Sequence, residues 1–169
     1  GTVYCAAGGL AGYNQDGGTI TGSYATGNVS GENAVGGLVG LMPTGTVSNS
    51  YATGNVNGTG SSIGGLVGGA TDSTITTCYY STGVVTGPSD NNSVGGLVGS
   101  MSNTTITGSY VTGNVNGSER TGGLVGSFLS GTVTNCYATG AVTGSYGVGG
   151  LFGFMDGGTA SNCHATGNV

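Results

Sequence analysis

Short stretches in which polar and aliphatic residues alternate recur along the whole chain. Thr46-Val47-Ser48 is typical, and the same order returns at Thr19-Ile20-Thr21, Thr74-Ile75-Thr76, Thr105-Ile106-Thr107, Thr132-Val133-Thr134 and Thr159-Ala160-Ser161. Alternation with a period of two predicts a short β-strand whose aliphatic residue faces a core and whose hydroxyl groups face outward. We therefore expect the same strand to be repeated along the chain.

A second pattern follows each of these stretches. In the segment 50–56, the small or apolar residues share one parity, and Tyr51, Thr53 and Asn55 share the other. We expect the first set to face inward, which places Ser50, Ala52, Gly54 and Val56 inside. The inward parity changes between Val47 and Ser50, and this change predicts a corner in the chain.

Both patterns belong to a repeat of 27 to 31 residues. A Gly-Gly-Leu phrase opens at Gly8, Gly36, Gly64, Gly95, Gly122 and Gly149. The phrase at 50–56 returns at 23–29, 78–85, 109–115, 136–142 and 163–169, and the copy at 78–85 has one extra residue. A period of this length is typical of stacked supersecondary units. We expect the Gly-Gly-Leu phrase to form a third short strand in each unit, with its leucine inside.

The repeat predicts an all-β fold. Its many glycines and β-branched residues disfavour helix, and no window has the apolar spacing of an amphipathic helix. We predict a parallel, right-handed β-solenoid of about six coils with 27–31 residues per coil. Residues 1–169 are expected to form a single repeat domain, uncapped at both ends and roughly 30 Å long if coils are about 4.8 Å apart.

Composition narrows the functional classes. Charged residues make up 4% of the chain, with Arg120 against six acidic residues and a pI near 4.1. Nucleic acids and anionic membranes are poor partners for such a chain, because it could not neutralise their charges. No apolar run approaches the roughly 20 residues of a membrane span. We expect no cofactor, metal site or catalytic group, and hence no enzyme.

The paired phrases Gly36-Gly37-Leu38-Val39-Gly40 and Ser50-Tyr51-Ala52-Thr53-Gly54-Asn55-Val56 resemble the GLUG motif. The resemblance covers essentially the whole chain. It implies a β-solenoid in large secreted or surface-attached proteins, including adhesin-like proteins, and it implies no active site. Four cysteines without any lysine also fit a secreted protein.

Stacking should turn each repeated position into a ladder. The outward hydroxyl ladder contains Thr19, Thr21, Thr46, Thr74, Thr76, Thr105, Thr107, Thr132 and Thr134. It resembles the flat threonine arrays of ice-binding solenoids, and the alternative is an ordinary exposed strand. A second ladder is expected from Tyr24, Tyr51, Tyr80, Tyr110 and Tyr137, closed by His164. It could offer rings to a glycan or another rod, or the rings could pack on one another.

Cysteines and sequons provide further candidate sites. Cys136 and Cys163 share a repeat position 27 residues apart, so adjacent coils should bring them close enough for a disulfide. Cys5 and Cys78 are candidates for bridges to another copy. Asn57 and Asn116 head glycosylation sequons and share one turn position.

The chain ends suggest a contact between copies. Val169 followed by residues 1–12 matches Val29 followed by 30–40 with one extra residue, as if one copy continued the next. The expected subunit interface comprises Gly1, Thr2, Val3, Tyr4, Ala165, Thr166, Gly167, Asn168 and Val169. We expect an extracellular head-to-tail homopolymer. The alternatives are an excerpt of a longer surface adhesin that binds glycan or protein, and an ice-binding solenoid.

Overall fold

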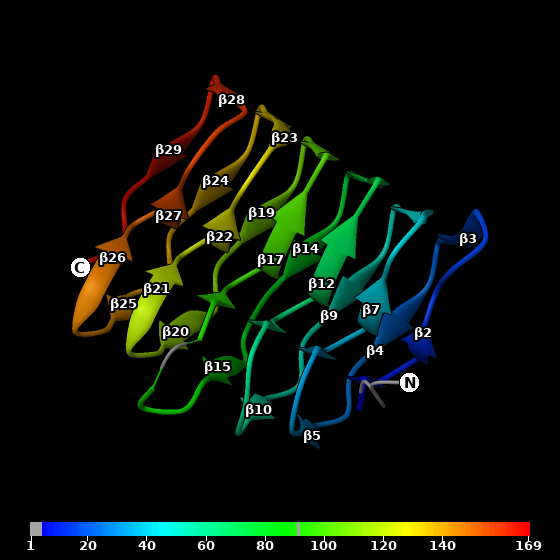
Figure 1. Ribbon diagram of the computed structural model, residues 1–169, viewed down its shortest axis with the longest axis horizontal. Helices are drawn as coiled ribbons and strands as arrows, with labels where there is room; N and C mark the ends of the chain where they lie inside the picture. The colour runs from blue at the N-terminus through cyan, green and yellow to red at the C-terminus, as the bar shows by residue number, and fades with distance from the viewer. Residues whose placement is uncertain (1–4, 91) are drawn as a thin grey trace.

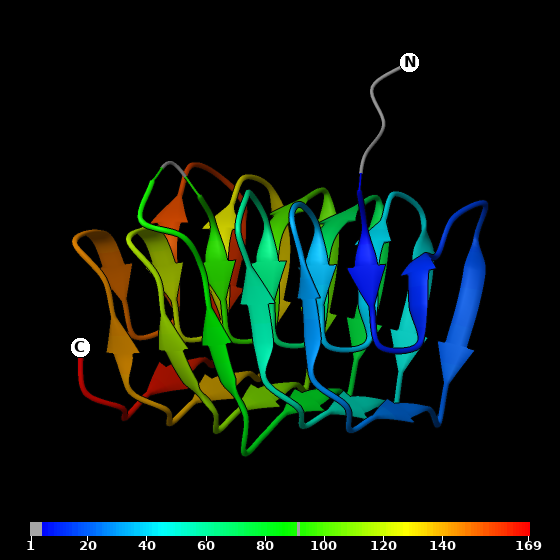
Figure 2. The same cartoon turned by 90° about the horizontal axis from the view of Figure 1, so that it is seen from below.

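The computed structural model describes residues 5–90 and 92–169, and this part of the chain consists of short strands and connecting bends without a helix. The strands stack in successive coils along a rod (Figures 1 and 2). In Figure 1 the N-terminal coil lies at the right. Nearer strands such as β7 and β12 run upward there, and more distant strands such as β9 and β14 run downward. The coils are therefore right-handed, and the predicted β-solenoid is confirmed.

Equivalent strands pair in parallel and build five sheets, which we name A to E in chain order. Sheet A contains β1 (Ala7–Gly8), β6 (Val35–Gly36), β11 (Ile63–Gly64), β16 (Val94–Gly95), β21 (Glu119–Gly122) and β26 (Tyr146–Gly149). Sheet B contains β2 (Ala11–Tyr13), β7 (Val39–Met42), β12 (Val67–Thr71), β17 (Val98–Ser102), β22 (Val125–Phe128) and β27 (Phe152–Met155).

The remaining three sheets complete each coil. Sheet C contains β3 (Gly18–Thr21), β8 (Gly45–Ser48), β13 (Ser73–Thr76), β18 (Thr104–Thr107), β23 (Gly131–Thr134) and β28 (Thr159–Ser161). Sheet D contains β4 (Tyr24–Ala25), β9 (Tyr51–Ala52), β14 (Tyr79–Tyr80), β19 (Tyr110–Val111), β24 (Tyr137–Ala138) and β29 (His164–Ala165). Sheet E contains β5 (Val29–Gly31), β10 (Val56–Gly58), β15 (Val84–Thr86), β20 (Asn114–Asn116) and β25 (Val142–Thr143).

A strand of sheet A opens each of six coils, so β1 to β5 form the first coil and β26 to β29 belong to the sixth. The sequence predicted three strands in a coil, and the structure has five. Segment 50–56 divides into β9 and the start of β10. The Gly-Gly-Leu phrase is not a strand but a bend, because β6 ends at Gly36 and β7 begins at Val39.

The bend explains the need for glycine. A Cβ atom on Gly36 would lie 1.9 Å from the carbonyl oxygen of Val39, and one on Gly37 would lie 2.2 Å from that of Gly65 in the next coil. Any side chain there would collide with backbone. Leu38, at the centre of the bend, is fully buried as predicted.

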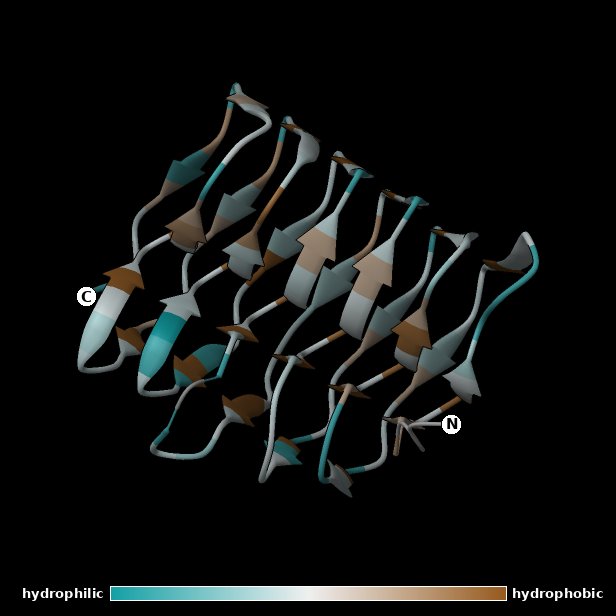
Figure 3. Ribbon diagram, viewed as in Figure 1, coloured by the Kyte–Doolittle hydropathy of each residue, from teal (hydrophilic) through white to brown (hydrophobic). Residues whose placement is uncertain are grey.

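The inward positions predicted for the second coil are confirmed. Val47, Ser50, Ala52 and Val56 are all fully buried. The expected corner lies at Asn49, which has a φ of 49° in the left-handed region. Its equivalents are also left-handed: Gly22, Thr77, Gly108, Asn135 and Asn162. Many equivalent strands share similar hydropathy from coil to coil, although β21 is more hydrophilic than its neighbour β26 (Figure 3). The core is therefore a set of stacked rows, and each row is continuous along the rod.

Candidate functional site

The hydroxyl ladder lies on the outside of sheet C. The register places Thr19, Thr46, Thr74, Thr105, Thr132 and Thr159 in one row, and Thr21, Ser48, Thr76, Thr107, Thr134 and Ser161 in a second. Some second-row hydroxyls bond each other: Ser48 donates to Thr21 over 3.1 Å, and those of Thr107 and Thr134 are 3.2 Å apart. All the predicted threonines are thus brought together in two parallel rows.

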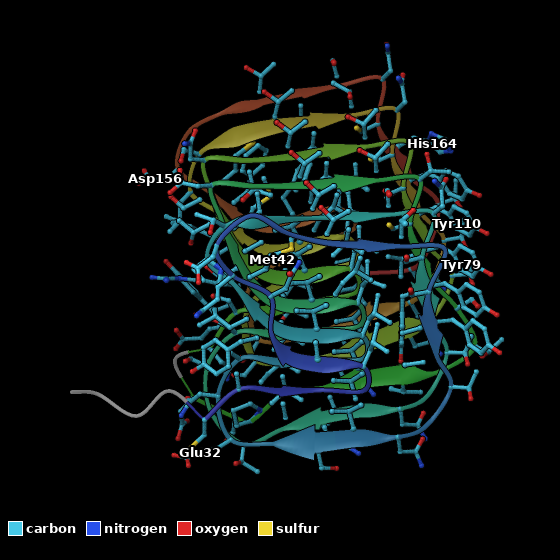
Figure 4. All side chains as sticks on the ribbon, turned by 90° about the vertical axis from the view of Figure 1, so that its right-hand side faces the viewer. Glu32, Met42, Tyr79, Tyr110, Asp156 and His164 are labelled. Carbon is cyan, nitrogen blue, oxygen red and sulfur yellow. The ribbon has the colours of Figure 1, made fainter. Side chains whose placement is uncertain are left out.

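The aromatic ladder runs along sheet D and differs from the prediction at one residue. Its members are Tyr24, Tyr51, Tyr79, Tyr110, Tyr137 and His164, stacked with centroid distances of 4.7 to 5.4 Å and interplanar angles of 3 to 11°. Figure 4 shows Tyr79, Tyr110 and His164 projecting from one side of the rod. The rings pack on one another, so the interior members present edges and hydroxyl groups. Burial and the neighbouring Tyr137 and Tyr79 raise the pKa of Tyr110.

The prediction that Tyr80 belongs to this ladder is wrong. Tyr79 pairs with Tyr51, and Tyr80 pairs with Ala52 inside the core. Tyr80 is fully buried, and its hydroxyl donates to the carbonyl oxygen of Gly54 over 3.0 Å. The extra residue of the third coil comes after the tyrosines, and Thr82 takes a φ of 65° there. Aligning the repeats from the corner at Thr77, rather than from Val85 at the end of the phrase, would have assigned Tyr79 to the ladder.

A row of hydrogen bonds that the sequence analysis missed lies just after the left-handed corner. The hydroxyl or thiol at this position donates to the carbonyl oxygen two residues before it, over 2.7 Å at Ser50 and 3.2 Å at Cys78. Ser23, Ser109, Cys136 and Cys163 make the same bond. The sequence pattern that could have indicated this bond is the occurrence of either serine or cysteine, both hydrogen-bond donors, at one repeat position.

Asparagine side chains join the coils at the entrance to sheet E. Asn28 accepts from the backbone N–H of Asn55 over 2.9 Å, and Asn55 accepts from that of Val84 over 3.0 Å. Asn114 accepts likewise from Ala141 over 3.0 Å. The sequence analysis placed these residues outside, correctly, and missed that each one ties its coil to the next.

All four cysteines are free thiols in the structure. Cys136 and Cys163 lie in adjacent coils as predicted, and the predicted disulfide between them stays a prediction. Cys78 is fully buried, so its side chain is not available for the predicted bridge to another copy. Burial raises the pKa of the Cys78 thiol. Cys5 is exposed in the first coil.

The two glycosylation candidates lie on the exposed face of sheet E. Asn57 and Asn116 both pair with Thr86, from its two sides, so they share a repeat position. That position lies within β10 and β20 rather than in the turn that the sequence predicted. Both side chains are exposed.

Exposed large apolar side chains gather at the two ends of the rod. The first coil exposes Leu10, Tyr13 and Tyr24, and the last exposes Tyr146, Phe154, Met155 and Val169, with Leu129 in the coil before. Of the predicted interface residues, Ala165, Thr166, Asn168 and Val169 are exposed and Gly167 is half-buried. Gly1, Thr2, Val3 and Tyr4 lie outside the described residues.

Two acidic residues lie across the rod from the aromatic ladder. Figure 4 shows Asp156 and Glu32 on the side of the rod opposite Tyr79 and Tyr110, with Met42 in the interior between them. The guanidinium of Arg120 lies 4.9 Å from the ring centroid of Phe154. Among residues 5–90 and 92–169 there is no pocket and no group of three metal-ligating side chains. In the same residues, no helix of membrane-spanning length and hydropathy occurs.

Comparison with known proteins identifies the repeat. The family model described as the GLUG motif matches residues 4–30, 31–57, 90–116 and 117–143. Neither a curated protein nor a solved structure matches the chain. The third coil, with Tyr80 and Thr82, lies between the matched segments, yet its strands keep the register of their neighbours. Because the matches cover more than half of the sequence and fall on stacked coils, the chain belongs to the GLUG-motif family.

Proposed function

We propose that this GLUG solenoid is a structural rod outside the cell, without catalytic activity, and that its end coils stack on those of further copies to form a fibre. The observation that carries the proposal is the confinement of exposed large apolar side chains mainly to the end coils. Leu10 in the first coil is 51% exposed, whereas its equivalent Leu38 in the second coil is fully buried. A further coil placed against either end would bury these side chains as the central coils bury theirs.

Three features of the end coils support a parallel, head-to-tail contact between copies. Tyr24 and His164 end the aromatic stack, and each has one stacking partner among the described rings. The outer strands β4 and β29 are edges of sheet D, and an edge strand is a template for another strand. Asn168 occupies the position at which Asn28 and Asn55 accept a backbone N–H from the following coil. One copy's first coil therefore complements another copy's last coil, and such a contact does not close on itself.

The test compares variants at the end and on the side of the rod. Leu10→Asp places a charge on the proposed contact, and Asn57→Asp places the same charge on sheet E, away from it. We expect the wild type and Asn57→Asp to form particles that grow with concentration in light scattering, and Leu10→Asp to remain at 16.0 kDa. Circular dichroism checks that all three keep the fold. A wild type that stays at 16.0 kDa would overturn the fibre proposal and favour a segment of a longer adhesin rod.

The hydroxyl rows of sheet C support a second candidate, binding to ice. The first row has a threonine in every coil and the second has threonine or serine, and this regularity could match an ordered lattice of water. Thr19→Tyr and Thr107→Tyr should then abolish shaping of ice crystals, while Leu10→Asp should leave it intact. For glycan binding, the stacked interior rings offer no free faces. That alternative depends on ring edges and on the two terminal faces.

A further inference from the structure

Two of the corner thiols are neighbours along the rod. Strands β24 and β29 pair with Tyr137 opposite His164, so the preceding residues, Cys136 and Cys163, occupy the same position in the fifth and sixth coils. Cys78 is different, because the equivalent residues in the coils on its two sides are Ser50 and Ser109. Cys136 and Cys163 therefore form one stacked pair of thiols. Cys78 occupies the same repeat position but has no cysteine in the adjacent coils, so it serves as a control.

The two side chains point the same way. Cys136 Sγ donates to the carbonyl oxygen of Thr134 over 3.1 Å, and Cys163 Sγ donates to that of Ser161 over 3.2 Å. Each Sγ also faces a carbonyl oxygen of the preceding coil, at 3.9 Å and 3.6 Å respectively. Burial, with a contribution from Cys163, raises the pKa of Cys136 to about 11. The two thiols are thus aligned in adjacent coils, and Cys163 is close enough to affect the pKa of Cys136.

We propose that Cys136 and Cys163 form an oxidant-dependent covalent clip that fastens the sixth coil to the fifth. Paired strands hold equivalent Cα atoms roughly 4.8 Å apart, and a disulfide accepts Cα separations of about 4.4 to 6.8 Å. For the bond to form, both sulfurs must rotate away from their carbonyl partners. Cys163 is half-buried and Cys136 is 1% exposed, so an oxidant in solution reaches Cys163 first.

The oxidant we name is a small disulfide such as oxidised glutathione. The Cys163 thiolate attacks one sulfur of glutathione disulfide, which forms a mixed disulfide and releases one glutathione. The Cys136 thiolate then attacks the Cys163 sulfur, and the second glutathione leaves. In total the two protein thiols give up two electrons and two protons, and the oxidant takes up both as it becomes two thiols.

The disulfide would stabilise the C-terminal end coil of the solenoid. The sixth coil, like the first, packs against a neighbouring coil on one side only, so these two end coils open more easily than the central ones. Cross-linking residues 136 and 163 restricts that opening by closing a loop between two coils. The inference concerns a single copy, in which the sixth coil has one neighbouring coil, and it predicts that oxidation stiffens the coil that offers the C-terminal edge.

The experiment uses the full chain with Cys5→Ser, because exposed Cys5 would itself be capped by glutathione. After treatment with oxidised glutathione, we expect the intact mass to fall by two hydrogens and peptide mapping to join residues 136 and 163. Amide hydrogen exchange in β28 and β29 should slow by roughly tenfold or more. Adding Cys78→Ser should change none of these results.

Adding Cys163→Ser or Cys136→Ser should abolish both the mass loss and the slower exchange. Serine makes the same corner hydrogen bond at Ser50 and Ser109, so both variants should keep the fold. A stable glutathione adduct on Cys163 with Cys136 still reduced would overturn the proposal. So would a bond that forms only in denaturant, or one that leaves exchange in β28 and β29 unchanged.

Discussion

Leu10 and Leu66 occupy equivalent positions in the first and third coils, but their surroundings differ. Leu66 is fully buried between two neighbouring coils, and Leu10 is 51% exposed because it has a neighbour on one side. The same contrast separates Tyr79, stacked on both faces, from Tyr24, stacked on one. At equivalent repeat positions, burial therefore depends on the number of adjacent coils. This dependence is the property of a repeat array stabilised by nearest-neighbour contacts.

The largest expected difference comes from leucine. Leu66→Ala should lower the free energy of unfolding by about 2 to 5 kcal/mol, because it leaves a cavity between packed coils. Leu10→Ala should cost less than about 1 kcal/mol, since much of the side chain is already in water. Urea unfolding of both variants measures the two values. Equal losses would contradict the dependence on adjacent coils.

Tyr80 sharpens the comparison within one coil. Tyr80→Phe should cost about 1 to 3 kcal/mol, because it removes the donor to the buried carbonyl oxygen of Gly54. Tyr79→Phe is the control. Its hydroxyl lies on the outer side of the rod, and its loss should change the unfolding free energy by less than about 0.5 kcal/mol. Similar losses for both variants would place Tyr80 outside the core.

The same residue predicts a loss of stability in alkali. Burial raises the pKa of Tyr80, so the folded chain keeps its proton at pH values where the unfolded chain has begun to release it. Its contribution is complete below about pH 10, the ordinary pKa of tyrosine, and declines as the pH rises above that value. Unfolding measured between neutral and alkaline pH should show a steeper fall for the wild type than for Tyr80→Phe. Parallel curves would contradict the burial of the phenol.

The aromatic ladder tests the number of neighbours directly. Tyr79 stacks at 4.7 Å on Tyr51 and at 5.0 Å on Tyr110, while Tyr24 has one ring partner at 5.2 Å. Each aromatic pair is worth about 0.5 to 1.5 kcal/mol. Tyr79→Ala should therefore destabilise the chain about twice as much as Tyr24→Ala in thermal unfolding. A larger effect at Tyr24 would mean that the stack contributes little.

The smallest expected effect concerns the asparagines that tie coils together. Asn55→Ala removes the acceptor for the N–H of Val84 and should cost about 1 kcal/mol. Asn57→Ala, two residues away on the exposed face of β10, should cost less than about 0.5 kcal/mol. Chemical unfolding under identical conditions separates them. Equal losses of unfolding free energy in the two variants would mean that the hydrogen bond between coils adds no stability.

Much of the fold followed from the repeat because stacking makes equivalent residues neighbours. The alternation in Thr46-Val47-Ser48 predicted that Val47 is buried. The change of inward parity between Val47 and Ser50 predicted the corner that lies at Asn49. The Gly-Gly-Leu phrase was harder. Its glycines showed close packing, but whether they form a strand or a bend depends on the backbone of the next coil, which one unit does not reveal.

The candidate sites were predicted less completely, because each depends on contacts between coils. Two adjacent tyrosines, Tyr79 and Tyr80, fit the outward position equally well by residue type, and only the register separates them. The corner bonds of Ser50 and Cys78 were missed because a buried serine looks like a small core residue. Asn55 was assigned to the surface correctly, but its acceptor role requires the following coil to be present.

The central claim is that each end coil becomes buried when the end coil of another copy packs against it. Cryo-electron microscopy of the purified chain at high concentration tests this claim most directly. Six coils spaced about 4.8 Å apart predict a fibre with a subunit rise of roughly 29 Å and sheets continuous across each junction. Discrete particles of 16.0 kDa with both end coils exposed would contradict it.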